Sequence, residues 1–336
     1  MFSMENWIKK NAYQLKERLG LGGVPIGTAF EKIPSEQALD VLQTAWELGV
    51  RYYDTSPWYG LTKSERTFGE FLNDKPRESF VFSTKVGRLF HQVPESQVPA
   101  TMWLDPLPYD FEHLYTADAV KKSIEDSLER TGLDYIDIVY VHDLSEDQVG
   151  DRYPYFLKQA ADGAFRVLSD YRSQGIIKGW GMGVNKIEPI LDCLNMADPD
   201  ICLSATQYSI IEHEDAVDRL LPAVRKAGVQ LVSGAGYNSG FIAGRERYNY
   251  KDVIPKGFKK RRDRIASISA EYGIDLITAA LHFVLSADEF VSIIPGVGRA
   301  DQVESNVRAL NASVPIEFWQ ALKEEGLIYS KAQVPG

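Results

Sequence analysis

Short apolar runs alternate with longer amphipathic segments along most of the 336-residue chain. The short runs are rich in β-branched and aromatic residues and stop at glycine, proline or polar residues, which is typical of strands. The longer segments repeat apolar residues every three to four positions, which is typical of helices. The predicted strands are residues 21–27, 50–54, 80–85, 136–142, 177–183, 201–207, 229–233 and 291–295. The predicted helices are residues 35–48, 64–73, 116–131, 155–174, 215–227, 256–272, 276–285 and 301–310.

Eight strands that alternate with helices predict a parallel sheet. A closed (β/α)₈ TIM barrel that forms one domain over residues 1–336 fits this order best, because no linker rich in glycine and serine divides the chain. A doubly wound open sheet is the alternative, but no Gly-x-Gly-x-x-Gly joins the first predicted strand to the first helix. Residues 87–115 contain many prolines, aromatics and polar residues without a clear period, so we expect this long loop to be a lid.

Composition and charge narrow the function classes. The net charge of −10 disfavours nonspecific binding to nucleic acid. Cys193 and Cys202 have neither a metal-binding nor a redox spacing, and they indicate a reducing compartment. No apolar run approaches the roughly 18 residues of a membrane span, and the first residues are too polar for a signal peptide. We therefore expect a cytoplasmic protein with no membrane partner.

Polar residues stand at the ends of three successive predicted strands: Asp54, Lys85 and His142. Tyr59 follows in the loop after Asp54. Because the carboxyl ends of barrel strands converge on one face, we expect these four side chains to be neighbours. An unpaired buried carboxylate costs several kcal/mol. Asp54 is therefore either solvated in a turn or paired with a cation, and Lys85 is the partner that we expect.

Such a set supports proton transfer by a phenol. A free tyrosine has a pKa near 10, and a neighbouring ammonium is expected to lower that pKa by favouring the phenolate. The carboxylate would hold the lysine, and the histidine would hydrogen-bond to a substrate oxygen. Taken singly, His142 would be interpreted as a histidine of the core, Lys85 as a surface lysine and Tyr59 as a half-buried packing residue. Their coincidence at successive strand ends favours catalysis.

The motifs resemble those of the aldo-keto reductases from about residue 19 to residue 310. They are Asp-Thr-Ser-Pro-Trp-Tyr-Gly at 54–60, Ser-Thr-Lys at 83–85, Tyr-Val-His at 140–142, Gly-Met-Gly-Val-Asn at 181–185 and Ile-Pro-Gly from 294 through to Asn306. The resemblance implies an oxidoreductase with a nicotinamide cofactor bound in an extended form, and Tyr59 as the proton-transfer residue.

Three further segments, at 123–130, 161–164 and 237–240, resemble one branch of that family. The branch comprises aldose 1-dehydrogenases that act on L-fucose, D-threo-aldoses and L-galactose, and a pyridoxal 4-dehydrogenase is similar to it. This implies oxidation of an aldose at C1 to the lactone. Pyridoxal oxidation and general aldehyde or ketone reduction remain open.

The resemblance also implies the cofactor contacts, with some departures. Gln207 stands two residues later than the usual glutamine, and Gly234 stands where many members have an aromatic that stacks on the nicotinamide. Gly296 and Gln302 occupy positions where relatives that prefer NADP often carry cations, which leaves Arg299 as the main candidate for a 2′-phosphate and favours NAD. The expected cofactor residues are Asn185, Gln207, Gly234, Gly296, Arg299, Gln302 and Asn306.

The substrate cannot be deduced from these motifs. The residues expected to surround it are Trp58, Phe90, Trp103, Asp143 and Tyr237. Two other classes compete. A cofactor-binding regulatory subunit of a potassium channel uses the same barrel, but the intact tetrad and the lid favour an enzyme. A metal-dependent hydrolase would need a His-x-His at a strand end, and the five histidines include no such pair, so no metal is expected.

Overall fold

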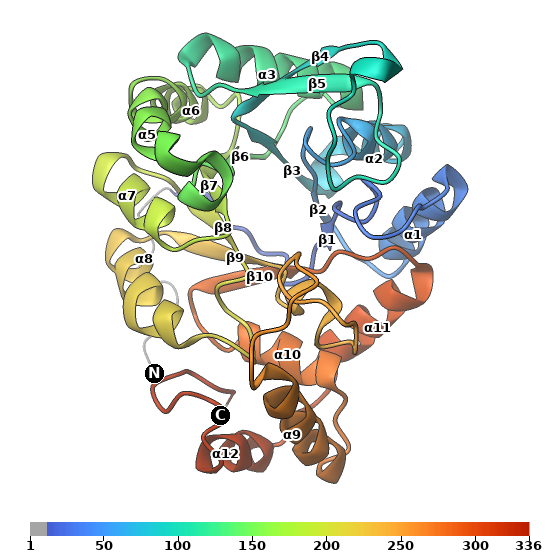
Figure 1. The fold of residues 1–336 in the computed structure, drawn as a ribbon, viewed down its shortest axis with the longest axis vertical. Coiled ribbons are helices and arrows are strands. Elements are labelled where there is room, and N and C mark those ends of the chain that lie inside the picture. Colours follow the sequence, from blue (N-terminus) through green and yellow to red (C-terminus); the bar gives the residue numbers. More distant parts are fainter. Residues whose placement is uncertain (1–11, 336) are drawn as a thin grey trace.

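Eight parallel strands form a barrel in the computed structural model, which describes residues 12–335. Neighbouring strands pair in the order β1-β2-β3-β6-β7-β8-β9-β10, which follows the chain (Figure 1). The predicted barrel is therefore confirmed, and the open sheet is wrong. The predicted single domain over 1–336 extends beyond the described residues at both ends. The strands are β1 (Leu21–Gly22), β2 (Tyr52–Asp54), β3 (Val81–Val86), β6 (Ile138–His142), β7 (Gly179–Val184), β8 (Ile201–Ala205), β9 (Gln230–Gly234) and β10 (Phe290–Ile294).

The barrel closes between β1 and β10 through few contacts. Leu19 bridges to Ile293 and Gly22 to Gly296, both in parallel orientation. The prediction of a strand over 21–27 is therefore too long, because the chain leaves the barrel after Gly22 in a series of turns. Gly22 lies so close to the end of β10 that a Cβ there would be 2.9 Å from the Ile294 carbonyl oxygen. The seam is thus narrow and tightly packed.

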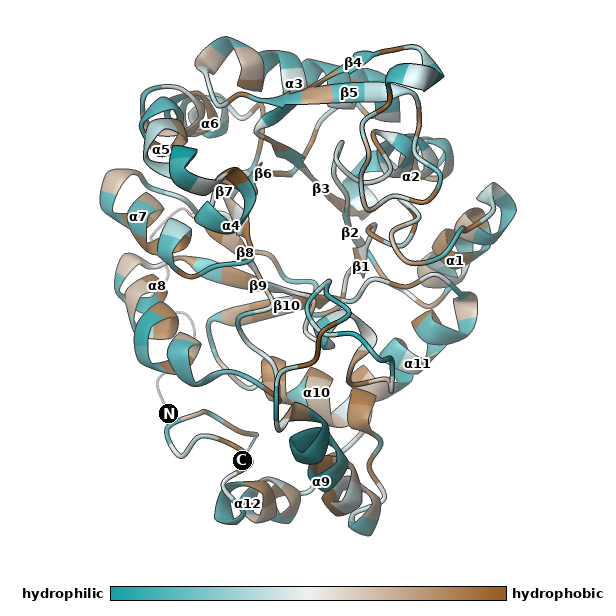
Figure 2. Ribbon diagram, in the orientation of Figure 1, coloured by the Kyte–Doolittle hydropathy of each residue, from teal (hydrophilic) through white to brown (hydrophobic). Residues whose placement is uncertain are grey.

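Helices surround the barrel, with their polar faces outward, while apolar colour concentrates in the strands (Figure 2). Strands covered on both sides read as almost continuous apolar runs, which is why they could be found from sequence. The helices are α1 (Ser35–Glu47), α2 (Lys63–Leu72), α3 (Ala117–Thr131), α4 (Glu146–Val149), α5 (Tyr153–Asp162), α6 (Ala164–Ser173), α7 (Glu188–Met196), α8 (Leu221–Ala227), α9 (Phe258–Glu271), α10 (Leu276–Val284), α11 (Ala300–Leu310) and α12 (Ile316–Glu324).

The helix predicted over 155–174 is two helices, α5 and α6. Gly163 lies between them with φ −120° and ψ −85°, outside the helical region. A Cβ at this position would lie 2.7 Å from the Ala117 nitrogen and from the Tyr115 oxygen. The close approach of the segment before α3 therefore keeps the chain from continuing as one helix. Helices α4, α7 and α12 were not predicted, and the predicted helix over 215–227 contains a π-helix at Ala216–Leu220.

The predicted lid lies at the barrel mouth, but it contains regular structure. Strands β4 (Arg88–Gln92) and β5 (Tyr109–His113) form an antiparallel hairpin in which Phe90 faces Phe111. Gly87, with φ +117°, turns the chain from β3 into this hairpin, and a Cβ there would overlap the Tyr115 ring. The hairpin escaped prediction because its residues show no clear alternation of buried and exposed positions.

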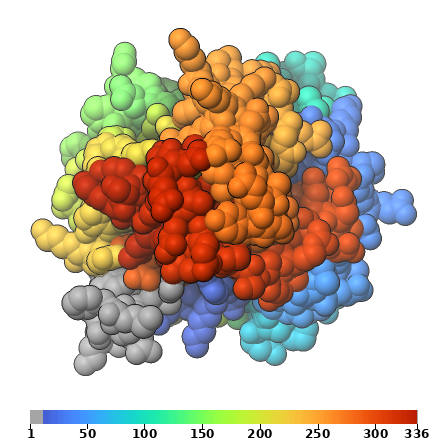
Figure 3. Space-filling model, turned by 90° about the horizontal axis from the view of Figure 1, so that it is seen from below, coloured from blue at the N-terminus to red at the C-terminus, as the bar shows by residue number. Residues whose placement is uncertain are grey.

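The C-terminal part of the chain lies at the end of the molecule farthest from the hairpin (Figure 1). There α12 packs against α9, and the segment after α12 lies beside them (Figure 3). His213 ties it down: its Nδ1 lies 2.9 Å from the Ser209 carbonyl oxygen, and its Nε2 accepts from the Tyr329 N–H at 3.0 Å. Among residues 12–335, no helix is long and apolar enough to cross a membrane.

Candidate functional site

Asp54 and Lys85 form a buried ion pair at the carboxyl ends of β2 and β3. Lys85 Nζ donates to Asp54 Oδ2 at 2.7 Å and to the Thr55 carbonyl oxygen at 2.7 Å. Ser83, which pairs with Asp54 in the sheet register, donates to Asp54 Oδ1 at 2.6 Å. Both charged side chains are 1 % exposed. Of the two readings of Asp54 left open by the sequence, pairing with Lys85 is therefore the one observed.

Burial and pairing oppose each other in this ion pair. Burial lowers the pKa of Lys85 and raises the pKa of Asp54, while the charge of each partner counteracts the shift of the other. A buried pair of this kind is tolerated only when the remaining hydrogen-bonding positions are satisfied. The Ser83 hydroxyl and the Thr55 carbonyl provide that satisfaction.

Tyr59 lies above the ion pair, in the loop between β2 and α2. Lys85 Nζ lies 4.8 Å from the centre of the Tyr59 ring. The phenol is 9 % exposed. Burial raises the pKa of Tyr59 well above 10, and the carboxylate of Asp54 adds to this rise. Arg88 is the positive charge that opposes this rise, and desolvation outweighs it, so the net shift of the Tyr59 pKa is upward.

His142 meets Tyr59 edge to face, with 5.8 Å between ring centres. Burial lowers the pKa of His142 well below 6.5, and the charges of Arg88 and Lys85 act in the same direction. The imidazole is therefore neutral near pH 7. Its Nδ1 lies 3.1 Å from Ser56 Oγ, which already accepts from the Trp58 N–H. The Ser56 hydroxyl has one proton to donate, and Nδ1 lies within its reach; in the tautomer that accepts this proton at Nδ1, the ring proton is on Nε2, which is then a hydrogen-bond donor.

Asp143 follows His142 directly and is held by a cation that sequence reasoning missed. Arg88 Nη1 donates to Asp143 Oδ2 at 2.9 Å, and both residues are buried. The guanidinium also lies 4.6 Å from the centre of the Trp58 ring. Asp143 has φ +51°, an unfavourable conformation for a non-glycine residue. The position of Arg88, just beyond the end of β3, was a signal that could have identified it.

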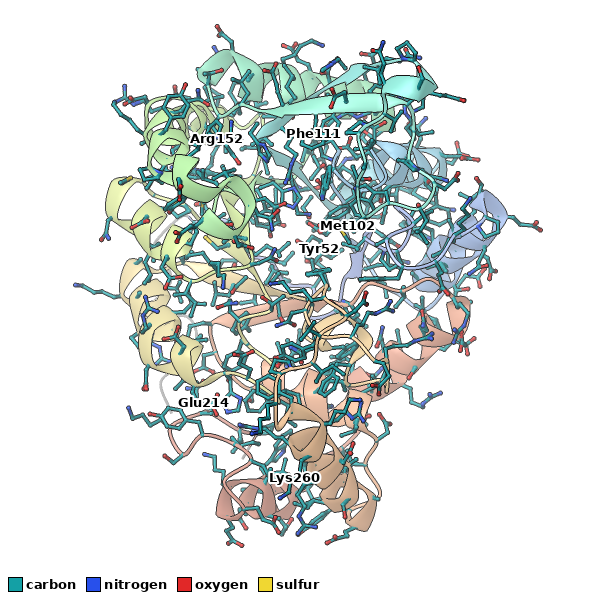
Figure 4. All side chains as sticks on the ribbon, in the orientation of Figure 1. Tyr52, Met102, Phe111, Arg152, Glu214 and Lys260 are labelled. Atoms are coloured by element: carbon teal, nitrogen blue, oxygen red, sulfur yellow. The ribbon has the colours of Figure 1, made fainter. Side chains whose placement is uncertain are left out.

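A cavity of about 660 Å³ opens over this cluster and continues toward α11. Figure 4 labels Met102 and Tyr52, which lie near the centre of the barrel opening, and Phe111 on the hairpin. Met102, from the loop of the hairpin, is one of the residues that line the cavity. The predicted residues that line the cavity are Asp54, Trp58, Tyr59, Lys85, Trp103, His142, Asp143, Asn185, Gly234, Tyr237, Gly296, Arg299, Gln302 and Asn306.

Two predicted residues do not line the cavity. Phe90 packs within the hairpin, with its ring centre 5.8 Å from that of Phe111. Gln207, which was expected to contact the cofactor, donates from Nε2 to the Asn185 carbonyl oxygen at 2.7 Å, so its amide is engaged by the backbone. The structure thus gives Phe90 a packing role and gives Gln207 a supporting one.

The end of the cavity near α11 holds polar side chains with mutual contacts. Arg299 donates to both carboxylate oxygens of Asp301, at 2.9 and 2.8 Å. Gln302 Oε1 accepts from the Gly298 N–H at 2.9 Å, and Asn306 Oδ1 accepts from the Tyr237 hydroxyl at 3.0 Å.

The loop between β9 and α9 supplies cavity residues that the sequence analysis missed. Arg245, Arg247 and Tyr250 come from this loop, which lies over one side of the barrel opening (Figure 1). The Arg247 guanidinium lies 3.8 Å from the centre of the Phe30 ring, and Tyr250 stacks on Phe30 at 6.3 Å. No pattern in the sequence marks Tyr250, which has the uncommon φ of +67°.

The shape and donor set of the cavity fit an extended dinucleotide. Its volume is within the range of about 300–1,000 Å³ typical of ligand sites. Three arginines and the N-terminal end of α11 line the cavity and can meet a diphosphate, and amide side chains also line it. Within residues 12–335, no group of three or more potential metal-ligating side chains is found.

Comparison with known proteins gives concordant results. The profile of the Aldo/keto reductase family matches residues 18–325. The chain is 35% identical to pyridoxal 4-dehydrogenase of Microbacterium luteolum, over 92% of this chain and 94% of that protein. It is 34% identical to D-threo-aldose 1-dehydrogenase of a Pseudomonas species, over the same shares of the two chains. The structure of an aldo-keto reductase from Bacillus halodurans in its holo form superposes with a TM-score of 0.71 and 21% identity, over 96% of this chain and 97% of the other.

Proposed function

Because the chain belongs to the aldo/keto reductase family, a family of NAD(P)-dependent oxidoreductases, we propose that it oxidises an aldose at C1 to the corresponding lactone. Sugars of the L-fucose, D-threo-aldose or L-galactose type are the proposed substrates. The observation that carries this proposal is the convergence of Tyr59, Lys85 and His142, with Asp54, on one wall of the cavity.

Oxidation at C1 of a sugar ring requires a base for the hydroxyl proton and an acceptor for the hydrogen on carbon. When bound, a nicotinamide ring supplies the two-electron redox chemistry. Tyr59, as phenolate, takes the hydroxyl proton. The neutral His142 donates a hydrogen bond from Nε2 to the same oxygen and so orients it. Lys85 stabilises the phenolate, and Asp54 keeps the ammonium beneath the ring.

The residues near α11 support NAD over NADP as the cofactor. Arg299 already shares two hydrogen bonds with Asp301, so a 2′-phosphate would have to displace a carboxylate and then lie beside it. Glu31 also lines the cavity and adds negative charge. Since cells generally keep NAD oxidised, this preference favours net oxidation. We expect kcat/KM to be higher with NAD, and Asp301→Asn to improve the use of NADP.

Pyridoxal is the second candidate substrate. The similarity to pyridoxal 4-dehydrogenase is as extensive as that to the aldose enzyme, and the aromatic side chains of Trp58, Trp103 and Tyr250 on the cavity wall suit a flat ring. A panel of aldoses and pyridoxal, each tested with NAD and with NADP, separates the candidates. Activity on pyridoxal alone would make pyridoxal the substrate in place of an aldose. Activity only in NADPH-driven aldehyde reduction would contradict the proposal of aldose oxidation.

Tyr59→Phe tests the proposed chemistry. The substitution keeps the ring and removes the proton acceptor, so turnover should fall by about 10²–10⁴-fold. Cofactor affinity, measured by fluorescence titration, should change little. Turnover within about tenfold of the unmodified enzyme would exclude Tyr59 as the base. If the unmodified protein binds the cofactor but turns over none of the substrates tested, that result would instead favour a regulatory subunit.

A further inference from the structure

The cavity contains an acidic side chain that the proposed proton transfer does not use. Asp143 is 7 % exposed, lines the cavity and stands beside His142. Its Oδ2 is occupied by Arg88, whereas its Oδ1 lies 3.6 Å from His142 Nε2. One carboxylate oxygen is thus anchored, and the other lies next to the atom expected to contact the reacting oxygen.

The two atoms have complementary hydrogen-bonding character. His142 Nε2, on the neutral ring, is a donor, and a carboxylate oxygen can only accept. Oxygens on neighbouring carbons lie somewhat closer together than these two atoms, so the donor can reach one of the oxygens while the acceptor reaches the other. A donor and an acceptor 3.6 Å apart can therefore bind two such oxygens at once, the first as the reacting oxygen and the second as a hydroxyl.

We propose that Asp143 selects substrates with a hydroxyl on the carbon next to the reacting carbon, and that Arg88 is the positioning residue that holds Asp143 for this purpose. The inference rests on the proposed function insofar as His142 contacts the reacting oxygen. It assigns the substrate class as 2-hydroxy aldehydes, which include the aldoses, whose 2-hydroxyl is free in both the open and the ring form.

The surroundings of Arg88 support a dedicated role. Its guanidinium is enclosed by the rings of Trp58 and Phe111, at 4.6 and 5.7 Å from their centres. Its buried Nε has no hydrogen-bond partner among the described residues, so the pair with Asp143 is the main compensation for burying this charge. The backbone of Asp143 is held in the left-handed region, and its N–H donates to the Gly183 carbonyl oxygen at 3.0 Å. The buried ion pair with Arg88 fixes the orientation of the carboxylate, on a backbone that is itself held by the hydrogen bond to Gly183.

The test compares L-lactaldehyde with propanal, which differ by one hydroxyl next to the aldehyde. Reduction of each by the reduced nicotinamide cofactor is measured as kcat/KM. A hydrogen bond from the hydroxyl to a charged acceptor should favour L-lactaldehyde by roughly 10- to 100-fold. Hydration of each aldehyde in water is the same for every variant, so comparing the ratio between variants removes this contribution.

Variants separate recognition from folding. Arg88→Met/Asp143→Leu removes both charges, leaves no unpaired ion, and should abolish most of the preference. Asp143→Asn keeps a neutral acceptor and should retain part of it, and Arg88→Lys should retain more than Arg88→Met. Phe90→Leu alters packing in the same hairpin without touching the ion pair, and should leave the ratio unchanged. Melting temperatures show which variants are folded.

Two results would overturn the inference: a ratio near one in the unmodified enzyme, or a ratio in the double variant equal to that of the unmodified enzyme. Failure of this inference can be distinguished from failure of the proposed function. If no aldose is oxidised with NAD but the ratio responds as expected, the substrate class stands and the direction of the reaction is wrong. If aldoses are oxidised but the ratio does not respond, only the role of Asp143 is wrong.

Discussion

At the Tyr59 hydroxyl, burial and the nearby acidic groups act together, and one positive charge opposes them. Burial raises the pKa of the phenol, with Asp54 and Tyr250 adding to the rise, whereas Arg88 lowers it. The proton therefore leaves Tyr59 less readily than it leaves a tyrosine in water. The site favours the phenol form, which is the form that would donate a proton if the proposed reaction ran as aldehyde reduction.

This balance predicts a pH dependence. The phenolate fraction grows tenfold per pH unit below the pKa, so the rate of aldose oxidation should rise steadily with pH and should not level off below about pH 10. Aldehyde reduction uses the phenol and should show no such rise. Initial rates in both directions across this range check the prediction, which a plateau of the oxidation rate near neutral pH would contradict.

Loss of the Lys85 charge should lower both activity and stability. Lys85→Met leaves Asp54 as an unpaired buried charge, which costs roughly 3–5 kcal/mol. Lys63→Met is the matched control, because Lys63 pairs with the exposed Asp105 at 2.5 Å and an exposed pair contributes at most about 1 kcal/mol. Equal melting temperatures for the two variants would contradict the account of the buried pair.

The residue types at the strand ends could be predicted from sequence, because a polar residue that terminates an apolar run needs a partner. Their contacts could be predicted less well. The period of two along a strand tells which face a residue is on, but not what covers that face. Phe90 is therefore a packing residue, and Gln207 bonds to the backbone of Asn185. The conformation of Asp143 and its pairing with Arg88 depend on the hairpin, which the sequence did not reveal.

The hairpin of β4 and β5 brings side chains from outside the barrel to the candidate site. It carries Arg88 at its first position, and Trp103 in its loop packs 5.7 Å from the Tyr59 ring, measured between ring centres. Elements with a strong period, such as α1 and α11, could be predicted to within a residue or two. The hairpin and the break at Gly163 could not, because contacts between distant segments determine both.

Gly87→Ala tests whether the hairpin positions the site. Gly87 has φ +117°, and a side chain there meets the Tyr115 ring, so we expect a marked loss of stability and of kcat/KM. Gly175→Ala is the control: Gly175 also has positive φ, at +74°, but nothing lies within 4 Å of the position that a Cβ would occupy there. It should cost only about 1–2 kcal/mol of conformational energy and leave catalysis unchanged. Equal effects of the two substitutions would mean that the hairpin does not depend on this close approach.

At the scale of the whole molecule, neutral buried histidines make stability depend on pH. Burial lowers the pKa of His213 to about 4 and that of His113 to about 4, from about 6.5 in the unfolded chain. The unfolded state therefore binds more protons between these values, and stability falls as pH decreases. The contribution is fully present above about pH 6.5 and is lost progressively toward pH 4.

His213→Gln should reduce this dependence. The variant loses the imidazole ring, which accepts from the Tyr329 N–H and packs against Phe283, and should melt lower at pH 7, but its melting temperature should fall less steeply between pH 7 and pH 5. In the unmodified protein, the protection of the Tyr329 amide against hydrogen exchange, measured relative to its intrinsic exchange rate, should fall as the pH approaches about 4, because a protonated imidazole no longer accepts. Parallel melting curves for the two proteins would contradict this role of His213.

The narrow seam between β1 and β10 has a consequence for biosynthesis. Residues 290–294 leave the ribosome after every other strand has emerged, so the ring stays open, with β1 and β9 as free edges, until nearly the whole chain has been made. Free strand edges pair with other chains. Nascent chains arrested before residue 290 should therefore be insoluble or chaperone-bound, and those arrested late enough to release β10 and α11 from the exit tunnel should become resistant to protease.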